Sequence, residues 1–316
     1  MRDWKARLNE KKLLVADGAW GTELAKRGLD AGEAPELWNA DRPDDVRAVA
    51  ASYVEAGADI VLTNTFGASP LKLARSGLES RCEELNRLGV ELSREAAGEN
   101  ALVFASLGPC GEFMEPLGTL SETEMIGHFA TQARAFEAAG ADGAALETMT
   151  DLGEARAALR AVKDNTSLPV VACMTFDSGR GGFATMMGVR PAQAAGELEA
   201  GGADLVGTNC GGGIAQMVEV ARQMREGTSL PLWCKPNAGL PELVDGRTVY
   251  RQSPEEMVCQ LPLLVEAGAC VVGGCCGTGP EHIRLIANES VNIVCAAWAQ
   301  LSQLGRSEEE ETDDDG

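Results

Sequence analysis

One phrase recurs four times along this chain, and it restricts the folds that the chain can adopt. Each copy starts with Glu-Ala, passes through glycine to Ala-Asp or Ala-Cys, and ends in a short apolar run; the copies begin at residues 55, 137, 199 and 266. Glu-Ala is typical of the end of a helix, the glycine supplies a left-handed cap, and the apolar run indicates a strand covered on both faces. The phrase therefore predicts that helices and strands alternate.

Four further apolar runs lie between these copies and bring the expected strands to eight. They span residues 13–16, 101–107, 169–174 and 231–234. Strands that alternate with helices form parallel sheets with right-handed crossovers, and eight of them in about 270 residues suit a closed barrel better than an open sheet. We predict an α/β protein with one (β/α)₈ TIM barrel over residues 1–300; an open doubly wound sheet is the alternative.

The last residues, 301–316, differ in composition from the rest. Seven acidic side chains lie between Glu308 and Asp315, and such a like-charge block is usually disordered and solvated. We expect an acidic disordered tail and assign it no function.

The whole chain has a formal charge of −21, and the part before the tail is acidic too. Because this charge repels phosphates, nucleic acid is excluded as a partner.

Neither a membrane span nor an export signal is expected. The chain has no uncharged apolar run of about 18 residues, and its first twelve residues are polar and charged. We predict a cytoplasmic protein that does not contact membranes. Cysteines in the cytoplasm normally remain thiols, so the adjacent pair Cys275 and Cys276 indicates a metal-binding or reactive site rather than a disulfide.

Each expected strand ends in a polar or glycine-rich phrase, at the end where barrels of this kind carry their chemistry. Cys210 follows the sixth strand, and Cys275 and Cys276 follow the eighth. Neighbouring strand residues point to opposite faces, so the pair reaches one ion only if the backbone turns, which flanking glycines permit. Three cysteine ligands with an open fourth position are typical of a catalytic zinc site.

The open position suits a thiol substrate better than water. Three thiolates carry more negative charge than zinc carries positive charge, which weakens the ion as a Lewis acid for hydrolysis. A thiol with a pKa near about 8.5 loses its proton on coordination, while its sulfur remains electron-rich. We therefore predict that zinc generates a sulfur nucleophile. The other cysteines are expected to fill the core, and His128 and His282 to lie on helix surfaces or cap helices.

These phrases resemble the homocysteine S-methyltransferase family over roughly residues 11 to 290. That family includes the homocysteine-binding module of cobalamin-dependent methionine synthase and betaine–homocysteine methyltransferase. The resemblance is carried by the phrases at residues 273–282, 207–210, 17–23, 63–67 and 235–239. It implies a TIM barrel, zinc held by Cys210, Cys275 and Cys276, and methylation of homocysteine, bound as a zinc thiolate, to methionine.

The resemblance also implies a set of substrate-binding residues. They are Asp17, Gly18, Thr63, Glu147, Asn209 and Asn237. Asp17 and Glu147 lie where the family holds the ammonium group of its substrate, which carboxylates can pair with; alternatively, Asp17 stabilises a turn and Glu147 caps a helix. The two asparagines either bind the substrate carboxylate or order loops. Beyond the zinc-activated substrate thiol, no catalytic group is expected.

The methyl donor is expected to arrive on another protein. The sequence lacks the Asp-x-His-x-x-Gly phrase of corrinoid proteins and the long C-terminal arm of the betaine enzymes. We therefore expect a separate methyl-corrinoid protein, with cobalamin on that partner alone. S-methylmethionine, S-adenosylmethionine or betaine as a free donor is one alternative. A non-catalytic zinc- or thiol-binding protein is another, whereas a metal-dependent hydrolase would need histidine or carboxylate ligands.

Overall fold

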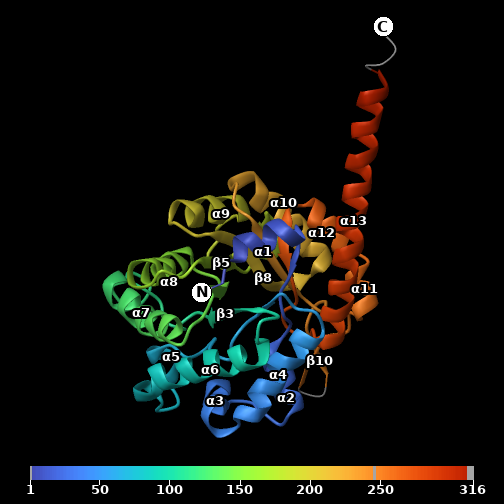
Figure 1. The fold of residues 1–316 in the computed structure, drawn as a ribbon. Coiled ribbons are helices and arrows are strands. Elements are labelled where there is room, and N and C mark those ends of the chain that lie inside the picture. The colour runs from blue at the N-terminus through green and yellow to red at the C-terminus, as the bar shows by residue number, and fades with distance from the viewer. Residues whose placement is uncertain (1, 245–246, 312–316) are drawn as a thin grey trace.

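The computed structural model describes residues 2–244 and 247–311, and a parallel eight-stranded sheet forms its centre (Figure 1). The strands are β1 (Leu14–Val15), β2 (Ile60–Val61), β3 (Leu102–Leu107), β4 (Gly143–Met149), β5 (Val170–Met174), β8 (Leu205–Gly213), β9 (Leu232–Asn237) and β12 (Ala269–Val272). Their order is β1-β12-β9-β8-β5-β4-β3-β2, and a parallel bridge between Ala16 and Ile60 joins the two edges. The predicted barrel is confirmed.

Each copy of the repeated phrase joins a helix to a strand in the structure, as the sequence predicted. Its four copies connect the ends of helices to β2, β4, β8 and β12. These helices are α4 (Pro43–Glu55), α7 (Glu122–Ala138), α9 (Pro191–Ala200) and α12 (Leu261–Glu266). At each connection one glycine has a φ between 81° and 106°; they are Gly57, Gly140, Gly202 and Gly268. A side chain is strained at such a φ, so glycine ends each helix and starts the next strand.

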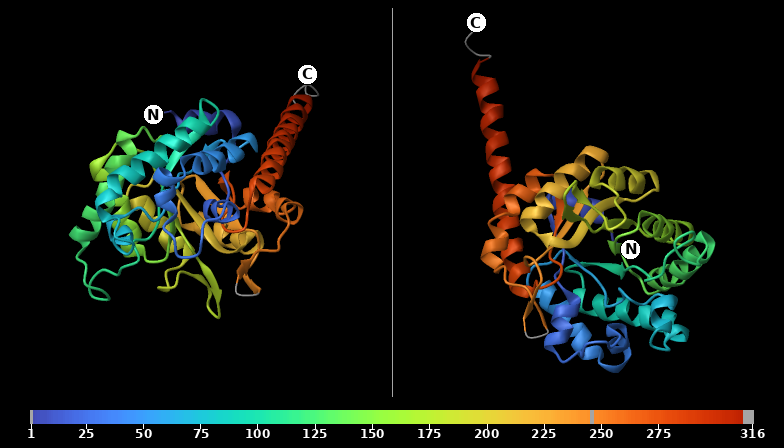
Figure 2. Two further views of the ribbon diagram at one scale, coloured as in Figure 1. Left: turned by 90° about the horizontal axis from the view of Figure 1, so that it is seen from below. Right: turned by 180° about the vertical axis from the view of Figure 1, so that it is seen from behind.

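Helices surround the barrel (Figures 1 and 2). The remaining ones are α1 (Trp4–Lys11), α2 (Trp20–Lys26), α3 (Trp38–Asp41), α5 (Pro70–Ala74), α6 (Cys82–Ala97), α8 (Leu152–Asn165), α10 (Ile214–Gly227), α11 (Pro254–Val258) and α13 (Pro280–Glu311), with 3₁₀ turns at Pro35–Leu37 and Glu79–Arg81. Apolar side chains of the helices pack against the outward-facing side chains of the strands and form the larger core.

A second, smaller core fills the inside of the barrel. Phe104 and Trp233 stack there with ring centroids 6.0 Å apart, alongside aliphatic side chains from the other strands. Trp4 of α1 belongs to the same cluster, so α1 covers the end of the barrel at which the strands begin. The interior is therefore packed, and the opposite end, called the barrel mouth below, is where a site can open.

Two antiparallel hairpins interrupt the alternation of strands and helices. One pairs β6 (Asp177–Gly179) with β7 (Gly182–Ala184), and the other pairs β10 (Glu242–Val244) with β11 (Arg247–Val249). They follow β5 and β9, and in Figure 2 they project from the same end of the molecule. The sequence analysis predicted neither. Both hairpins extend the walls of the barrel mouth.

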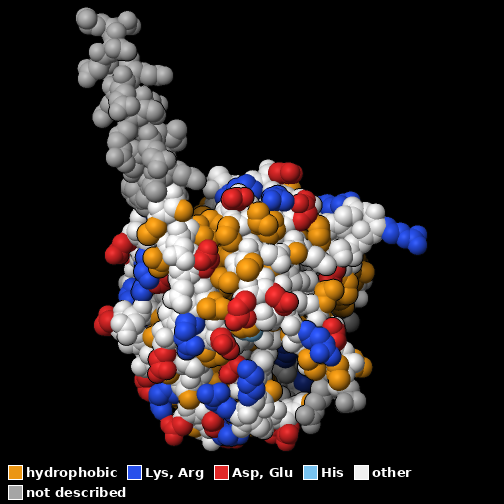
Figure 3. Space-filling view, turned by 90° about the vertical axis from the view of Figure 1, so that its right-hand side faces the viewer, with side chains coloured by type: hydrophobic (Ala, Val, Ile, Leu, Met, Phe, Trp, Pro, Cys, Tyr) orange, Lys and Arg blue, Asp and Glu red, His pale blue; other side chains and the backbone are white. Residues whose placement is uncertain are grey.

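The helix α13 leaves the barrel and extends into solvent (Figure 1). Residues 301–311 continue it, and residues 312–316 lie outside the described residues, so the predicted division into a barrel and a disordered tail at residue 300 stays a prediction. In the described part of the chain, no helix is both long and apolar enough to span a membrane. On the side shown in Figure 3, basic and acidic side chains are intermixed.

Candidate active site

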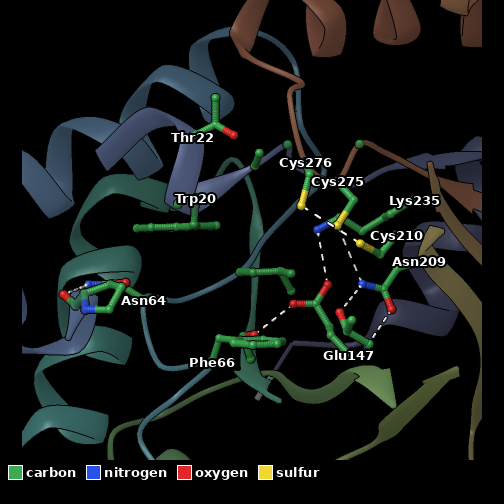
Figure 4. Close-up of a pocket in the computed structure, with 18 of the residues that line it drawn as sticks. Trp20, Thr22, Asn64, Phe66, Glu147, Asn209, Cys210, Lys235, Cys275 and Cys276 are labelled. Carbon is green, nitrogen blue, oxygen red and sulfur yellow. Dashed lines mark hydrogen bonds and ion pairs between the residues drawn. The ribbon is translucent and has the colours of Figure 1, made fainter. Parts of the chain in front are cut away.

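Three cysteines meet at the barrel mouth. The Sγ atoms of Cys210, Cys275 and Cys276 lie within 4.8 Å of one another, and those of Cys210 and Cys276 are 3.9 Å apart (Figure 4). Cys210 reaches the cluster because the end of β8 leaves the regular strand conformation: its φ is 65°, and that of Gly211 is 66°. Asn237 holds this turn by donating from Nδ2 to the carbonyl of Gly211 at 2.7 Å.

A second turn brings the adjacent cysteines to the same side. After β12 the backbone remains tied to the barrel, because the N–H of Gly274 donates to the Asp17 carbonyl at 2.9 Å and that of Cys275 to the Pro236 carbonyl at 2.8 Å. The chain then turns through Gly277, which has a φ of 82°, and the Thr278 hydroxyl closes the turn on the Cys275 carbonyl at 2.7 Å. The turn that the flanking glycines were predicted to permit is present.

The chemistry of this donor set fits zinc. A hydrogen bond with Cys210, together with burial, raises the pKa of the Cys275 thiol to about 12. Without a cation the cluster is therefore protonated at neutral pH, and a divalent ion is needed to stabilise thiolates this close together. Among the described residues, these cysteines are the one group of three or more Cys, His, Asp or Glu side chains whose ligand atoms lie close enough to share an ion. Three thiolates match the preference of zinc for sulfur ligands.

A cavity of about 310 Å³ opens beside the cysteines. Its wall contains all three cysteines and four of the six predicted substrate-binding residues, namely Gly18, Thr63, Glu147 and Asn209. At Gly18 the chain has no space for a side chain, because a Cβ would lie 2.8 Å from the ring of Tyr53. The other two predicted residues, Asp17 and Asn237, are buried behind the wall. Asn237 orders a loop, which is one of its two predicted roles.

A buried lysine that the sequence analysis did not select lies between the two acidic residues. Lys235, within β9, places its Nζ 2.7 Å from Asp17 Oδ1 and 3.5 Å from Glu147 Oε1. Burial works to lower the pKa of Lys235, but Asp17 and Glu147 outweigh it and raise that pKa. Burial also raises the pKa of Glu147, which the Lys235 charge partly counteracts. Lys235 is therefore charged and neutralises much of this acidic pair.

This geometry is accompanied by similarity to known proteins. The model of the family described as homocysteine S-methyltransferase matches residues 14–290. The chain belongs to the homocysteine S-methyltransferase family. This membership confirms the family that the sequence phrases resembled.

The chain is similar to methionine synthases and to a homocysteine methyltransferase of known structure. It is 32% identical to the methionine synthase of Mycobacterium tuberculosis over 303 residues, and 32% identical to that of Mycobacterium leprae over 297 residues. These matches cover 90% and 88% of the chain but 25% and 24% of the relatives, so the chain spans about a quarter of their length. The metallated form of the Escherichia coli homocysteine methyltransferase MmuM has a TM-score of 0.75 and 25% identity, with 90% of this chain and 99% of that chain covered.

The amide of Asn209 connects two sides of the cavity. Its Oδ1 accepts from the N–H of Thr148 at 2.6 Å, and its Nδ2 donates to the Thr148 hydroxyl at 2.7 Å and to Cys275 Sγ at 3.7 Å. Thr148 has a φ of 61°, a conformation that these bonds hold. Asn209 therefore orients a sulfur of the cluster rather than facing the cavity with unused hydrogen-bonding groups.

Several other side chains of the cavity wall were not selected in the sequence analysis. Trp20 and Phe66 supply flat apolar walls (Figure 4), and Ser106 donates from its hydroxyl to Glu147 Oε2 at 2.8 Å. Thr63, which was predicted, accepts from the N–H of Ser106 at 3.0 Å. The phrases at the strand ends contained Trp20 and Phe66, but aromatic residues there are as compatible with packing as with a cavity wall.

Proposed function

We propose that this chain methylates the sulfur of homocysteine to give methionine. The observation that carries the proposal is the meeting of Cys210, Cys275 and Cys276 at the wall of one cavity, in a barrel of the homocysteine S-methyltransferase family. The cavity of about 310 Å³ lies at the small end of the range for ligand sites, which suits a short amino-acid thiol.

Zinc held by the three cysteines would lower the pKa of the acceptor thiol, so that a nucleophilic sulfur is present at neutral pH. Other residues of the chain position the zinc ligands and form the cavity around the acceptor. Asn209 donates to Cys275 Sγ and so orients one ligand, and Trp20 and Phe66 give the cavity apolar walls. In the reaction the new S–CH₃ bond forms with the electron pair of the sulfur, the bond between methyl and donor breaks with its electron pair left on the donor, and the thiol proton goes to solvent.

We further propose that a separate methyl-corrinoid protein brings the methyl group. In support, six large apolar side chains are exposed on loops around the barrel mouth. This apolar rim consists of Phe113, Leu117, Met186, Met187, Leu240 and Leu243. Leu243 is 78% exposed and Met186 is 68% exposed, and exposed apolar groups gathered around a site are typical of a protein-binding surface. The similarity to methionine synthases, which are about four times longer than this chain, also supports a donor that is carried on a separate protein.

A free small donor is the second candidate, and two findings favour it. The match to the E. coli homocysteine methyltransferase covers 99% of that chain, so that protein is a single chain of similar extent. In addition, the faces of Trp20 and Phe66 line the cavity, and aromatic faces attract sulfonium and quaternary ammonium groups.

Single-turnover assays with zinc-loaded protein and homocysteine test these proposals. A methyl-corrinoid protein, S-methylmethionine, S-adenosylmethionine and betaine are each supplied as the donor, and methionine is measured. We expect methionine from the methyl-corrinoid protein. Methionine from a free donor alone contradicts the partner protein but leaves methylation of homocysteine intact. If no donor gives methionine, the proposed function is wrong.

A further inference from the structure

The cation between Asp17 and Glu147 comes from the chain itself. Asp17 is fully buried, and both of its oxygens are already used: Oδ1 accepts from Lys235 Nζ at 2.7 Å, and Oδ2 accepts from Trp20 Nε1 and from the N–H of Leu62, both at 2.8 Å. It is not part of the cavity wall. An ammonium group on a ligand therefore cannot pair with Asp17 unless one of these three donors leaves.

Of the pair Asp17 and Glu147, Glu147 is the one that faces the cavity, but it too has internal partners. Ser106 donates to Oε2 at 2.8 Å, and Lys235 Nζ lies 3.5 Å from Oε1. A ligand ammonium at Glu147 would share this carboxylate with Lys235 and would be repelled by that nearby like charge.

We propose that Lys235 replaces the ammonium group of the acceptor, so that this cavity also takes thiols and thioethers that carry a carboxylate and no amino group. The inference rests on the proposed function, because it concerns the acceptor of the same methyl transfer. It assigns Lys235 as a specificity-determining residue. Mercaptocarboxylates are then acceptors alongside homocysteine, with the same bond changes at sulfur.

Product binding tests this without zinc, since a thioether needs no metal to enter the cavity. Isothermal titration calorimetry of the metal-free protein compares methionine with 4-(methylthio)butanoate, which differs from methionine only by lacking the amino group. We expect dissociation constants within about threefold of each other, because Lys235 leaves the ammonium little to gain. If the ammonium makes a full charge-assisted bond, methionine binds more than about tenfold tighter, and the inference is wrong.

The two proposals fail in different ways. Tight methionine binding with weak binding of the desamino compound overturns the role of Lys235 but leaves the proposed function standing. If neither compound binds, the cavity is not the acceptor site and both proposals are wrong.

A substitution at Lys235 tests whether this residue sets the preference between methionine and 4-(methylthio)butanoate. Lys235→Met should shift the preference toward methionine by about tenfold, because a ligand cation then has two uncompensated carboxylates to pair with. Lys163→Met removes an exposed lysine of α8 that pairs with Asp204 and should leave the preference unchanged. An unchanged preference in folded Lys235→Met, checked by circular dichroism, contradicts the assignment. If that variant does not fold, the wild-type comparison still decides.

Discussion

Cys210 has a backbone conformation that residues other than glycine seldom adopt. Its φ of 65° costs on the order of 1 kcal/mol or more, and the hydrogen bond from Asn237 to the carbonyl of Gly211 helps to hold it. Without this turn the side chain would follow the alternation of β8 and would not meet Cys275 and Cys276. Backbone strain at this residue is therefore connected to the formation of the sulfur cluster, which suits a site that binds a metal.

Replacing any one of these three cysteines with alanine should abolish stoichiometric zinc binding. Two sulfur ligands with no third protein ligand hold zinc far more weakly, so the content should fall from about one zinc per chain toward zero after dialysis. Elemental analysis of the purified variants measures this. Cys259→Ala, which changes an exposed cysteine away from the cluster, is the matched control and should retain zinc. Full zinc content in all three cluster variants would show that the metal lies elsewhere.

The cysteines could be selected from the sequence, whereas Lys235 could not. Three cysteines beside glycines at the ends of strands have no packing explanation, because glycine supplies no core side chain. A lysine at the end of a strand is ordinary, since its long side chain usually reaches solvent. The available signal was its position directly after the apolar residues Leu232 to Cys234, but this position does not distinguish a buried lysine from one that reaches solvent. Which partner it finds depends on the packing of β1 and β4 around it.

At the scale of whole elements, the strands were predictable and the hairpins were not. Helix ends, glycine caps and apolar runs follow each other in the repeated phrase, so local preference and burial favour the same structure. The hairpin β6–β7 contains polar and glycine residues, and its β6 residues are exposed, so it has no apolar alternation to reveal it. Its position is determined by the barrel that it extends.

The start of α13 should make stability depend on pH. His282 accepts from the N–H of Gly279 through Nδ1 at 3.2 Å, and burial lowers the pKa of its imidazole below 6.5. As pH falls through 6.5 the unfolded chain takes up the proton first, so the free energy of unfolding decreases. His282→Gln should lose less stability between pH 7.5 and 5.5 than the wild type, although it should start about 1 kcal/mol lower through the lost hydrogen bond. Urea denaturation at both values measures this.

His128→Gln is the control for that experiment, because His128 lies on α7, far along the chain from the start of α13. It should keep the pH dependence of the wild type. An identical pH dependence in His282→Gln and the wild type would show that the capping contact contributes nothing to it.

The whole molecule presents its apolar rim and its cavity at the same end of the barrel. The rim residues come from the loops after β3, β5 and β9, which project together in Figure 2. The cysteines and the cavity lie at this same end, where the strands end. A donor that is carried by a protein must pass this rim, whereas a small donor needs the cavity alone.

The double variant Met186→Asp and Leu243→Asp should therefore affect protein-borne donors selectively. Two charges on the rim disfavour burial against a partner, so KM for methylcobalamin bound to a cobalamin-binding protein should rise by about tenfold or more. Transfer from free methylcobalamin and the zinc content should stay unchanged, because neither side chain lines the cavity. Val291→Asp, at a 62% exposed apolar residue of α13, is the control and should change neither KM. An equal effect on free and protein-borne methylcobalamin would show that the rim shapes the cavity and does not receive a partner, since only docking distinguishes the two donors.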